Sequence, residues 1–133
     1  MSATKPTLLL IEDDTFLAGM YVTKLTMEHF NVELATDGEA GLAKAKDLLP
    51  DLILLDILLP KLNGFDVLRA LKADAQTAAI PVVLLTNLGQ KSDVLEGLNL
   101  GAADYLIKAH FMPSEVVDKI KEHLRDTSGH RPR

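Results

Sequence analysis

The strongest constraint on the fold of this chain is the alternation of short apolar runs with longer amphipathic segments. Five apolar runs stand out: TLLLIE (7–12), NVELAT (31–36), DLILLD (51–56), IPVVLLT (80–86) and DYLIK (104–108). Three of them are nearly continuous, which is typical of parallel strands buried on both faces. Because a segment of helix length follows each run, the pattern predicts parallel βαβ units with right-handed crossovers.

The segments between the runs carry apolar residues at spacings of three to four, as amphipathic helices do. Helices are expected at residues 15–29, 38–49, 64–74, 90–100 and 113–125. In the fourth of these, the expected apolar face consists of Val94, Leu95 and Leu98, and Gly101 follows as a stop signal. Strand and helix therefore alternate five times.

A chain of 133 residues is expected to form one domain. The alternating pattern covers residues 7–125. Residues 1–6 are expected to be a flexible N-terminal arm, and residues 126–133, DTSGHRPR, a tail or the start of a linker.

Composition excludes several classes of function. The net charge of −5 argues against nucleic-acid binding by this chain alone, because phosphates would be repelled. Cysteine is absent, the first residues lack the apolar stretch of a signal peptide, and no apolar run approaches the ~20 residues of a membrane span. These features predict a cytoplasmic protein with no membrane association.

Acidic and hydroxyl side chains stand where the predicted strands end. Glu12 and Asp13 follow the first strand, Asp56 ends the third, and Thr86 ends the fourth. In open parallel sheets, ligands bind beyond the carboxyl ends of the strands, where strand order reverses. If the first and third strands are neighbours, the three carboxylates meet and repel one another. A hard cation such as Mg²⁺ would relieve that repulsion, so the cluster is interpreted as a metal site with an open coordination position.

Asp14 and Asp56 differ in whether a purely structural function can explain the presence of a carboxylate. Asp14, the residue after Asp13, is expected to be the N-cap of the helix that follows. Asp56 sits inside an apolar run, where an isolated carboxylate is costly.

The same residues weigh against two other classes of protein. A flavodoxin-type nucleotide binder would carry glycine or hydroxyl residues after the first strand, whereas EDDT would repel phosphate. A phosphatase of the haloacid dehalogenase type would carry its aspartate nucleophile there, with a second Asp two positions later. Relative to Asp56, that later position holds Leu58.

Over about residues 7–125 the sequence resembles the receiver domain of bacterial two-component response regulators. The matching stretches are LLLIEDD, DLILLDILLPKLNGFDVL, IPVVLLTN and GAADYLIK. The most specific is Asp-x-x-Leu-Pro-x-x-Asn-Gly, which begins at Asp56. The resemblance implies an α/β fold with a flavodoxin-like, doubly wound sheet of five parallel strands in the order 2-1-3-4-5 and five helices.

The resemblance also implies a phosphoacceptor and a cofactor. Asp56 would accept the phosphoryl group. Mg²⁺ would be bound by Asp13, by Asp56 and by the backbone carbonyl of Leu58, with Glu12 helping through water. The chain would catalyse only its own phosphorylation and dephosphorylation.

Three further residues would respond to the phosphoryl group. Thr86 would donate a hydrogen bond to it, Lys108 would pair with one of its oxygens, and Tyr105 would be an aromatic switch that turns inward as Thr86 moves. The implied phosphodonor is a sensor histidine kinase or a phosphotransfer protein. The output would pass through the last two helices and the strand between them, by phosphorylation-dependent homodimerisation or by binding a partner.

Two departures from the family pattern keep alternatives open. Ala109 follows Lys108 where most receivers have proline, a feature shared with a branch of stand-alone-looking receivers, and Asn87 replaces a small residue. The chain could therefore be a receiver-like interaction module that is not phosphorylated. A third hypothesis is a hydrolase that uses Asp56 as its nucleophile.

Overall fold

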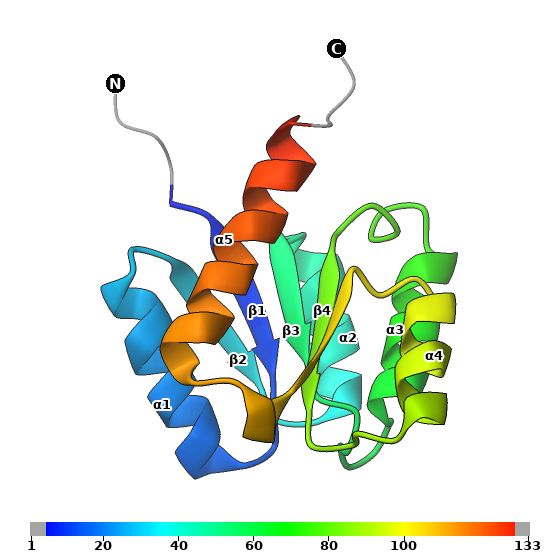
Figure 1. The fold of residues 1–133 in the computed structure, drawn as a ribbon. Coiled ribbons are helices and arrows are strands. Elements are labelled where there is room, and N and C mark those ends of the chain that lie inside the picture. The colour runs from blue at the N-terminus through cyan, green and yellow to red at the C-terminus, as the bar shows by residue number, and fades with distance from the viewer. Residues whose placement is uncertain (1–4, 130–133) are drawn as a thin grey trace.

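The computed structural model describes residues 5–129 as a five-stranded parallel sheet covered by helices on both faces (Figure 1). The strands are β1 (Thr7–Ile11), β2 (Asn31–Ala35), β3 (Leu52–Leu55), β4 (Val82–Thr86) and β5 (Asp104–Ile107). Their order is β2-β1-β3-β4-β5, and every neighbouring pair is parallel. The predicted fold class and strand order are confirmed.

The five helices begin close to the expected positions. They are α1 (Thr15–Met27), α2 (Gly38–Leu48), α3 (Gly64–Ala73), α4 (Lys91–Asn99) and α5 (Pro113–Gly129). The expected end of the last helix at residue 125 is wrong, because α5 continues to Gly129 and takes in residues 126–129 of the expected tail. The expected arm at residues 1–4 and the end of the tail at 130–133 lie outside the described residues. Within the described part of the chain, no helix is long and apolar enough to cross a membrane.

Two apolar cores, one on each face of the sheet, hold the layers together. On one face, α1 and α5 pack on Leu8 and Leu10 of β1; on the other, α2 and α3 pack on Leu9 and Ile11. All four residues of β3 have no exposed surface. The continuous apolar runs are thus explained by burial of both faces, and they make the strands rigid supports for the loops that follow.

Side-chain caps fix the loops at the carboxyl edge of the sheet. Asp14, Asp37 and Asn63 precede α1, α2 and α3, and each accepts a hydrogen bond from the backbone N–H three residues later, at 2.8–3.1 Å. These bonds satisfy N–H groups that have no partner inside the helix. The expected capping function of Asp14 is confirmed.

The expected apolar face of α4 is only partly correct, because Val94 is half-buried but the two leucines are not. Leu95 and Leu98 are 50% and 44% exposed, and Gly97 is the buried residue of the helix. The helix packs through this glycine, where an added Cβ would lie 2.6 Å from Cδ1 of Leu84 and 3.0 Å from the ring of Tyr105. Close approach through Gly97 turns the two leucines outward. Gly101 after the helix has a φ of +105°, so its expected function as a stop signal is confirmed.

We expect Gly97→Ala to lower the free energy of unfolding by about 1–3 kcal/mol, because the added methyl overpacks the contact with Leu84 and Tyr105. Urea unfolding measures the change. Gly19→Ala is the control, since nothing lies within 4 Å of its added Cβ; it should raise stability by about 0.5–1 kcal/mol through helix propensity. Equal effects of the two substitutions would contradict the packing argument.

Candidate functional site

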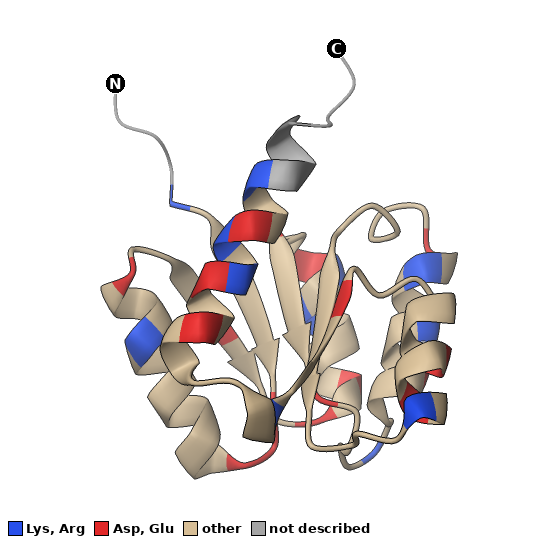
Figure 2. Ribbon diagram, viewed as in Figure 1, with Lys and Arg blue, Asp and Glu red and all other residues tan. Residues whose placement is uncertain are grey.

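The carboxyl ends of four strands bring the predicted site residues to one edge of the sheet. The register pairs Ile11 with Leu55 and Thr86 with Ile107, so the residues that follow β1 and β3 emerge side by side, and those that follow β4 and β5 do the same. The backbone N–H of Asp56 donates to the Ile11 carbonyl at 3.0 Å. Figure 2 shows acidic residues in the loops at this edge.

Glu12, Asp13 and Asp56 form the predicted carboxylate cluster. One carboxylate oxygen from each lies within 4.8 Å of the others. Glu12 and Asp56 are only 2% and 6% exposed, whereas Asp13 is exposed. Two buried negative charges therefore stand beside one that reaches solvent.

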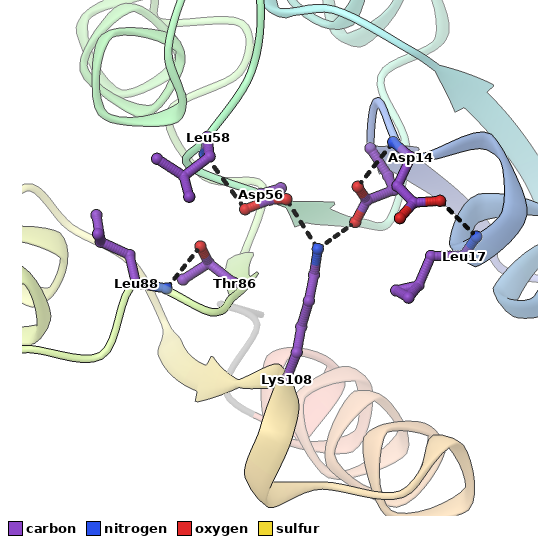
Figure 3. Close-up of polar contacts among 8 residues, drawn as sticks. Asp14, Leu17, Asp56, Leu58, Thr86, Leu88 and Lys108 are labelled. Carbon is purple, nitrogen blue, oxygen red and sulfur yellow. Dashed lines mark hydrogen bonds and ion pairs between the residues drawn. The ribbon is translucent and has the colours of Figure 1, made fainter.

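Lys108, directly after β5, reaches the two buried carboxylates of the cluster (Figure 3). Its Nζ lies 2.6 Å from Oε1 of Glu12 and 2.8 Å from Oδ2 of Asp56. Three carboxylates and one ammonium leave a formal charge of −2. The sequence analysis placed Lys108 at the site. Its contact with Glu12 could not be predicted from the sequence, because Glu12 follows β1 and Lys108 follows β5, and β3 and β4 lie between these two strands.

The ionisation of these groups reflects burial and their mutual contacts. Burial raises the pKa of Glu12 above its usual range, against the opposing hydrogen bond from Lys108. Burial acts to lower the pKa of Lys108, but the hydrogen bonds to Asp56 and Glu12 outweigh it and raise that pKa. Lys108 is therefore cationic at neutral pH.

The loop between β3 and α3, residues 56–63, supplies a further oxygen. The backbone N–H of Leu58 donates to Oδ1 of Asp56 at 3.3 Å. The carbonyl of Ile57 accepts from Leu59 and Gly64, at 3.0 and 2.8 Å. Within the described part of the chain, the Leu58 carbonyl accepts no hydrogen bond, so an oxygen is left for another ligand.

The donor set fits a magnesium ion. Buried carboxylates in excess of the available positive charge, with an unpaired backbone carbonyl in the adjoining loop, provide the hard oxygen ligands that Mg²⁺ prefers. Asp13 borders a cavity of about 530 Å³ that is also lined by Leu58 and Leu88. A small charged molecule could reach the cluster from this side.

Thr86 and Tyr105 are linked through Leu88. Thr86 is fully buried, and its Oγ1 accepts a hydrogen bond from the Leu88 N–H at 3.3 Å (Figure 3). The Tyr105 hydroxyl donates a short hydrogen bond to the Leu88 carbonyl. Burial raises the pKa of Tyr105 to about 12, so the hydroxyl keeps its proton. The sequence analysis found Thr86 and Tyr105 but not the residue that connects them.

The loop after β5 contains Ala109 at the position where most receivers have proline, as the sequence analysis noted. Residues Lys108–His110 form a single 3₁₀ turn that includes Ala109. No cis peptide bond occurs within residues 5–129. Asn87, the other departure, is exposed beside Thr86.

Comparisons with known proteins agree with the geometry. Residues 8–121 match the model of the response regulator receiver domain. The chain is 43% identical over 122 residues to the DNA-binding dual master transcriptional regulator RpaA of a Synechocystis strain, covering 92% of this chain and 50% of that protein. It is 39% identical over 125 residues to the DNA-binding response regulator MtrA of Mycobacterium tuberculosis, covering 94% and 53%.

The chain thus spans about half the length of the curated relatives it matches. A solved structure of a CheY-like response regulator receiver domain protein from Methanospirillum hungatei superimposes with a TM-score of 0.88 at 28% identity. That match covers 96% of this chain and 99% of the other.

We expect Lys108→Met to lower the free energy of unfolding by about 3 kcal/mol at pH 7 without metal, because it leaves two buried carboxylates unpaired. Urea unfolding measures the loss. In the wild type the hydrogen bond from Lys108 opposes the effect of burial on the pKa of Glu12, so without Lys108 this pKa rises further and the native variant takes up a proton more readily than the native wild type. The variant's deficit should therefore shrink as pH falls from 7 towards 5.

Lys121→Met is the matched control, since Lys121 also pairs with a glutamate, Glu28, at 2.9 Å but is 42% exposed. Its loss should stay below about 1 kcal/mol. Similar losses for the two variants would contradict the assignment of Lys108 as the counterion of a buried cluster.

Proposed function

The chain belongs to the response regulator receiver domain family, and on this basis we propose that Asp56 accepts a phosphoryl group in a Mg²⁺-dependent reaction that switches the conformation of the chain. The observation that carries the proposal is the contact of Lys108 with Glu12 and Asp56 inside the carboxylate cluster. Stability alone does not require three clustered carboxylates with a single lysine as counterion. A site that must receive a cation and then a phosphoryl group does.

Asp13 and Asp56, the Leu58 carbonyl, and Glu12 through water would hold the ion. When bound, Mg²⁺ supplies positive charge that offsets the charge of the transferring phosphoryl group. The proposed cofactor is thus matched to the formal charge of −2 at the site.

The reacting atom is a carboxylate oxygen of Asp56. A bond forms between this oxygen and phosphorus as the bond from phosphorus to the donor's imidazole nitrogen breaks, and the electron pair of that bond returns to the donor. A carboxylate is a weak nucleophile, so rigid placement at the end of the buried strand β3 and charge compensation by Lys108 do most of the work. The proposed donor is a sensor histidine kinase or a phosphotransfer protein.

The switch would begin at Thr86. If the Thr86 side chain moves so that its hydroxyl can donate to the phosphoryl group, the displaced Oγ1 would no longer accept from the Leu88 N–H, and the Leu88 carbonyl is also the acceptor for Tyr105. The loop after β4 and the Tyr105 ring, which packs on Gly97 of α4, would then move together. This coupling supports an output through α4, β5 and α5, by self-association or by binding a partner.

We propose that residues 7–125 constitute the receiver and that this chain does not itself bind nucleic acid. The two named relatives are DNA-binding regulators of about twice its length. The chain's net charge is −5, and Figure 2 shows α5 carrying charges of both signs rather than a basic face.

The alternative is a receiver-like module that is not phosphorylated. The low exposure of Asp56, at 6%, together with Asn87 and Ala109, favours it. Binding of Mg²⁺ separates the two, because a module without phosphoacceptor function has no need of the ion.

Incubation with Mg²⁺ and a small phosphodonor such as phosphoramidate should add one phosphoryl group at Asp56, detected by intact mass and peptide mapping. Asp56→Asn should acquire none. The proposed function would be excluded if the wild type stayed unmodified under these conditions and its NMR spectrum also did not change on addition of beryllofluoride.

The affinity for Mg²⁺ should fall as pH is lowered from 7.5 to 5.5. Burial raises the pKa of Glu12, so Glu12 takes up a proton at a higher pH than an ordinary glutamate, and the ion favours the carboxylate form. Titration followed by NMR measures the affinity. Glu12→Gln should bind more weakly at pH 7.5 and show a smaller pH dependence; an unchanged pH dependence would indicate another titrating group.

A further inference from the structure

The first turn of α2 contacts the loop that follows β3, which carries Asp56 and Leu58. The backbone N–H of Gly38 donates to the Pro60 carbonyl at 3.2 Å, and Lys61 lies 3.8 Å from Asp37, the N-cap of α2. Lys61 itself has a φ of 71°, in the left-handed region. These contacts join two segments that share no strand pairing.

The contact at Gly38 leaves no room for a side chain. An added Cβ would lie 1.8 Å from the carbonyl oxygen of Leu62 and 2.6 Å from its carbonyl carbon. These are backbone atoms, so rotation of a side chain cannot relieve the clash. Either the loop or the helix must retreat by about 1 Å or more.

The loop is the part that can move. Gly41 and Ala45 fix α2 against the sheet, because both are buried, Ala45 packs in the core with Ile11, and a Cβ at Gly41 would meet the Ile11 side chain. Pro60 and Lys61 are exposed, and few backbone hydrogen bonds tie residues 58–62 to the rest of the molecule. A side chain at position 38 would therefore be accommodated by displacing residues 60–62.

We propose that Gly38 is a positioning residue for the metal site: by letting the loop at Pro60–Leu62 pack directly on α2, it holds the Leu58 carbonyl in place for the ion. The inference rests on the proposed function, because it concerns the same Mg²⁺ site. Gly38 touches neither the ion nor a reacting atom. It acts through Pro60 and Leu62.

The test compares the Mg²⁺ dissociation constant of the wild type, Gly38→Ala and Gly97→Ala by calorimetric titration, with urea unfolding in EDTA as a separate readout. Gly97→Ala is the control for overpacking in general, since its added Cβ would meet the side chains of Leu84 and Tyr105, a milder clash, and its nearest atoms include none of residues 56–63. We expect Gly38→Ala to weaken Mg²⁺ binding about tenfold or more, as loss of an outer support of a metal site does. Gly97→Ala should stay within about twofold of the wild type despite its lower stability.

Binding by Gly38→Ala within twofold of the wild type would overturn the inference, and so would an equal loss in Gly97→Ala, which would indicate general destabilisation. If Gly38→Ala does not fold, the wild type supplies the test by reciprocity: Mg²⁺ should slow solvent exchange of the Gly38 N–H, measured by NMR. Exchange that is unchanged when the site is saturated would overturn it. If the wild type binds no Mg²⁺ at all, the proposed function fails as well. If the wild type binds Mg²⁺ and is phosphorylated, but Mg²⁺ binding does not change in Gly38→Ala, only this inference fails.

Discussion

Electrostatic repulsion among Glu12, Asp13 and Asp56 is the constraint on which the site depends. Their oxygens lie within 4.8 Å of one another, and two of the three side chains are almost completely buried. Carboxylates this close raise the free energy of the folded chain unless positive charge lies between them. Lys108 supplies one charge by reaching across from β5. The remaining deficit of positive charge is what the proposed divalent cation would offset.

The rest of the fold explains how such a cluster can be tolerated. The strands β1 and β3 are buried on both faces and place Glu12 and Asp56 side by side through an ordinary parallel register. The apolar cores on both faces of the sheet provide the stability from which the charged edge subtracts. The loops at that edge are held by three side-chain helix caps, by the Gly38 N–H and by the hydrogen bonds of Leu88, each of which joins a side chain or N–H to the backbone of a loop or of a helix start.

The strict rules of parallel sheets made the acidic residues and Thr86 predictable, whereas Lys108, Tyr105 and the Leu58 carbonyl came from the family resemblance. Apolar runs that are continuous, and do not alternate with polar residues, indicate a parallel sheet covered on both faces. Ligands bind at the carboxyl edge of such a sheet. Asp56 in the middle of an apolar run was therefore informative, as were the residues that end the other strands. Periodicity was less reliable for α4, because Leu95 and Leu98 match an amphipathic pattern while the helix packs through Gly97. The end of α5 was also missed, since the residues after Leu124 lack an apolar signal although the backbone remains helical to Gly129.

The sequence by itself determined the class of fold, the order of the strands through its family resemblance, and the set of chemical groups at the edge of the sheet. These follow from local patterns, in which each residue's contribution depends on its near neighbours in the chain. Only the tertiary structure decided that Lys108 contacts both Glu12 and Asp56, that Leu88 joins Thr86 to Tyr105, and that Gly38 supports the loop carrying Leu58. Each of these contacts joins segments that approach only when the sheet and its helices are assembled. The exact distances between such segments are set by packing, and no pattern along the chain encodes them.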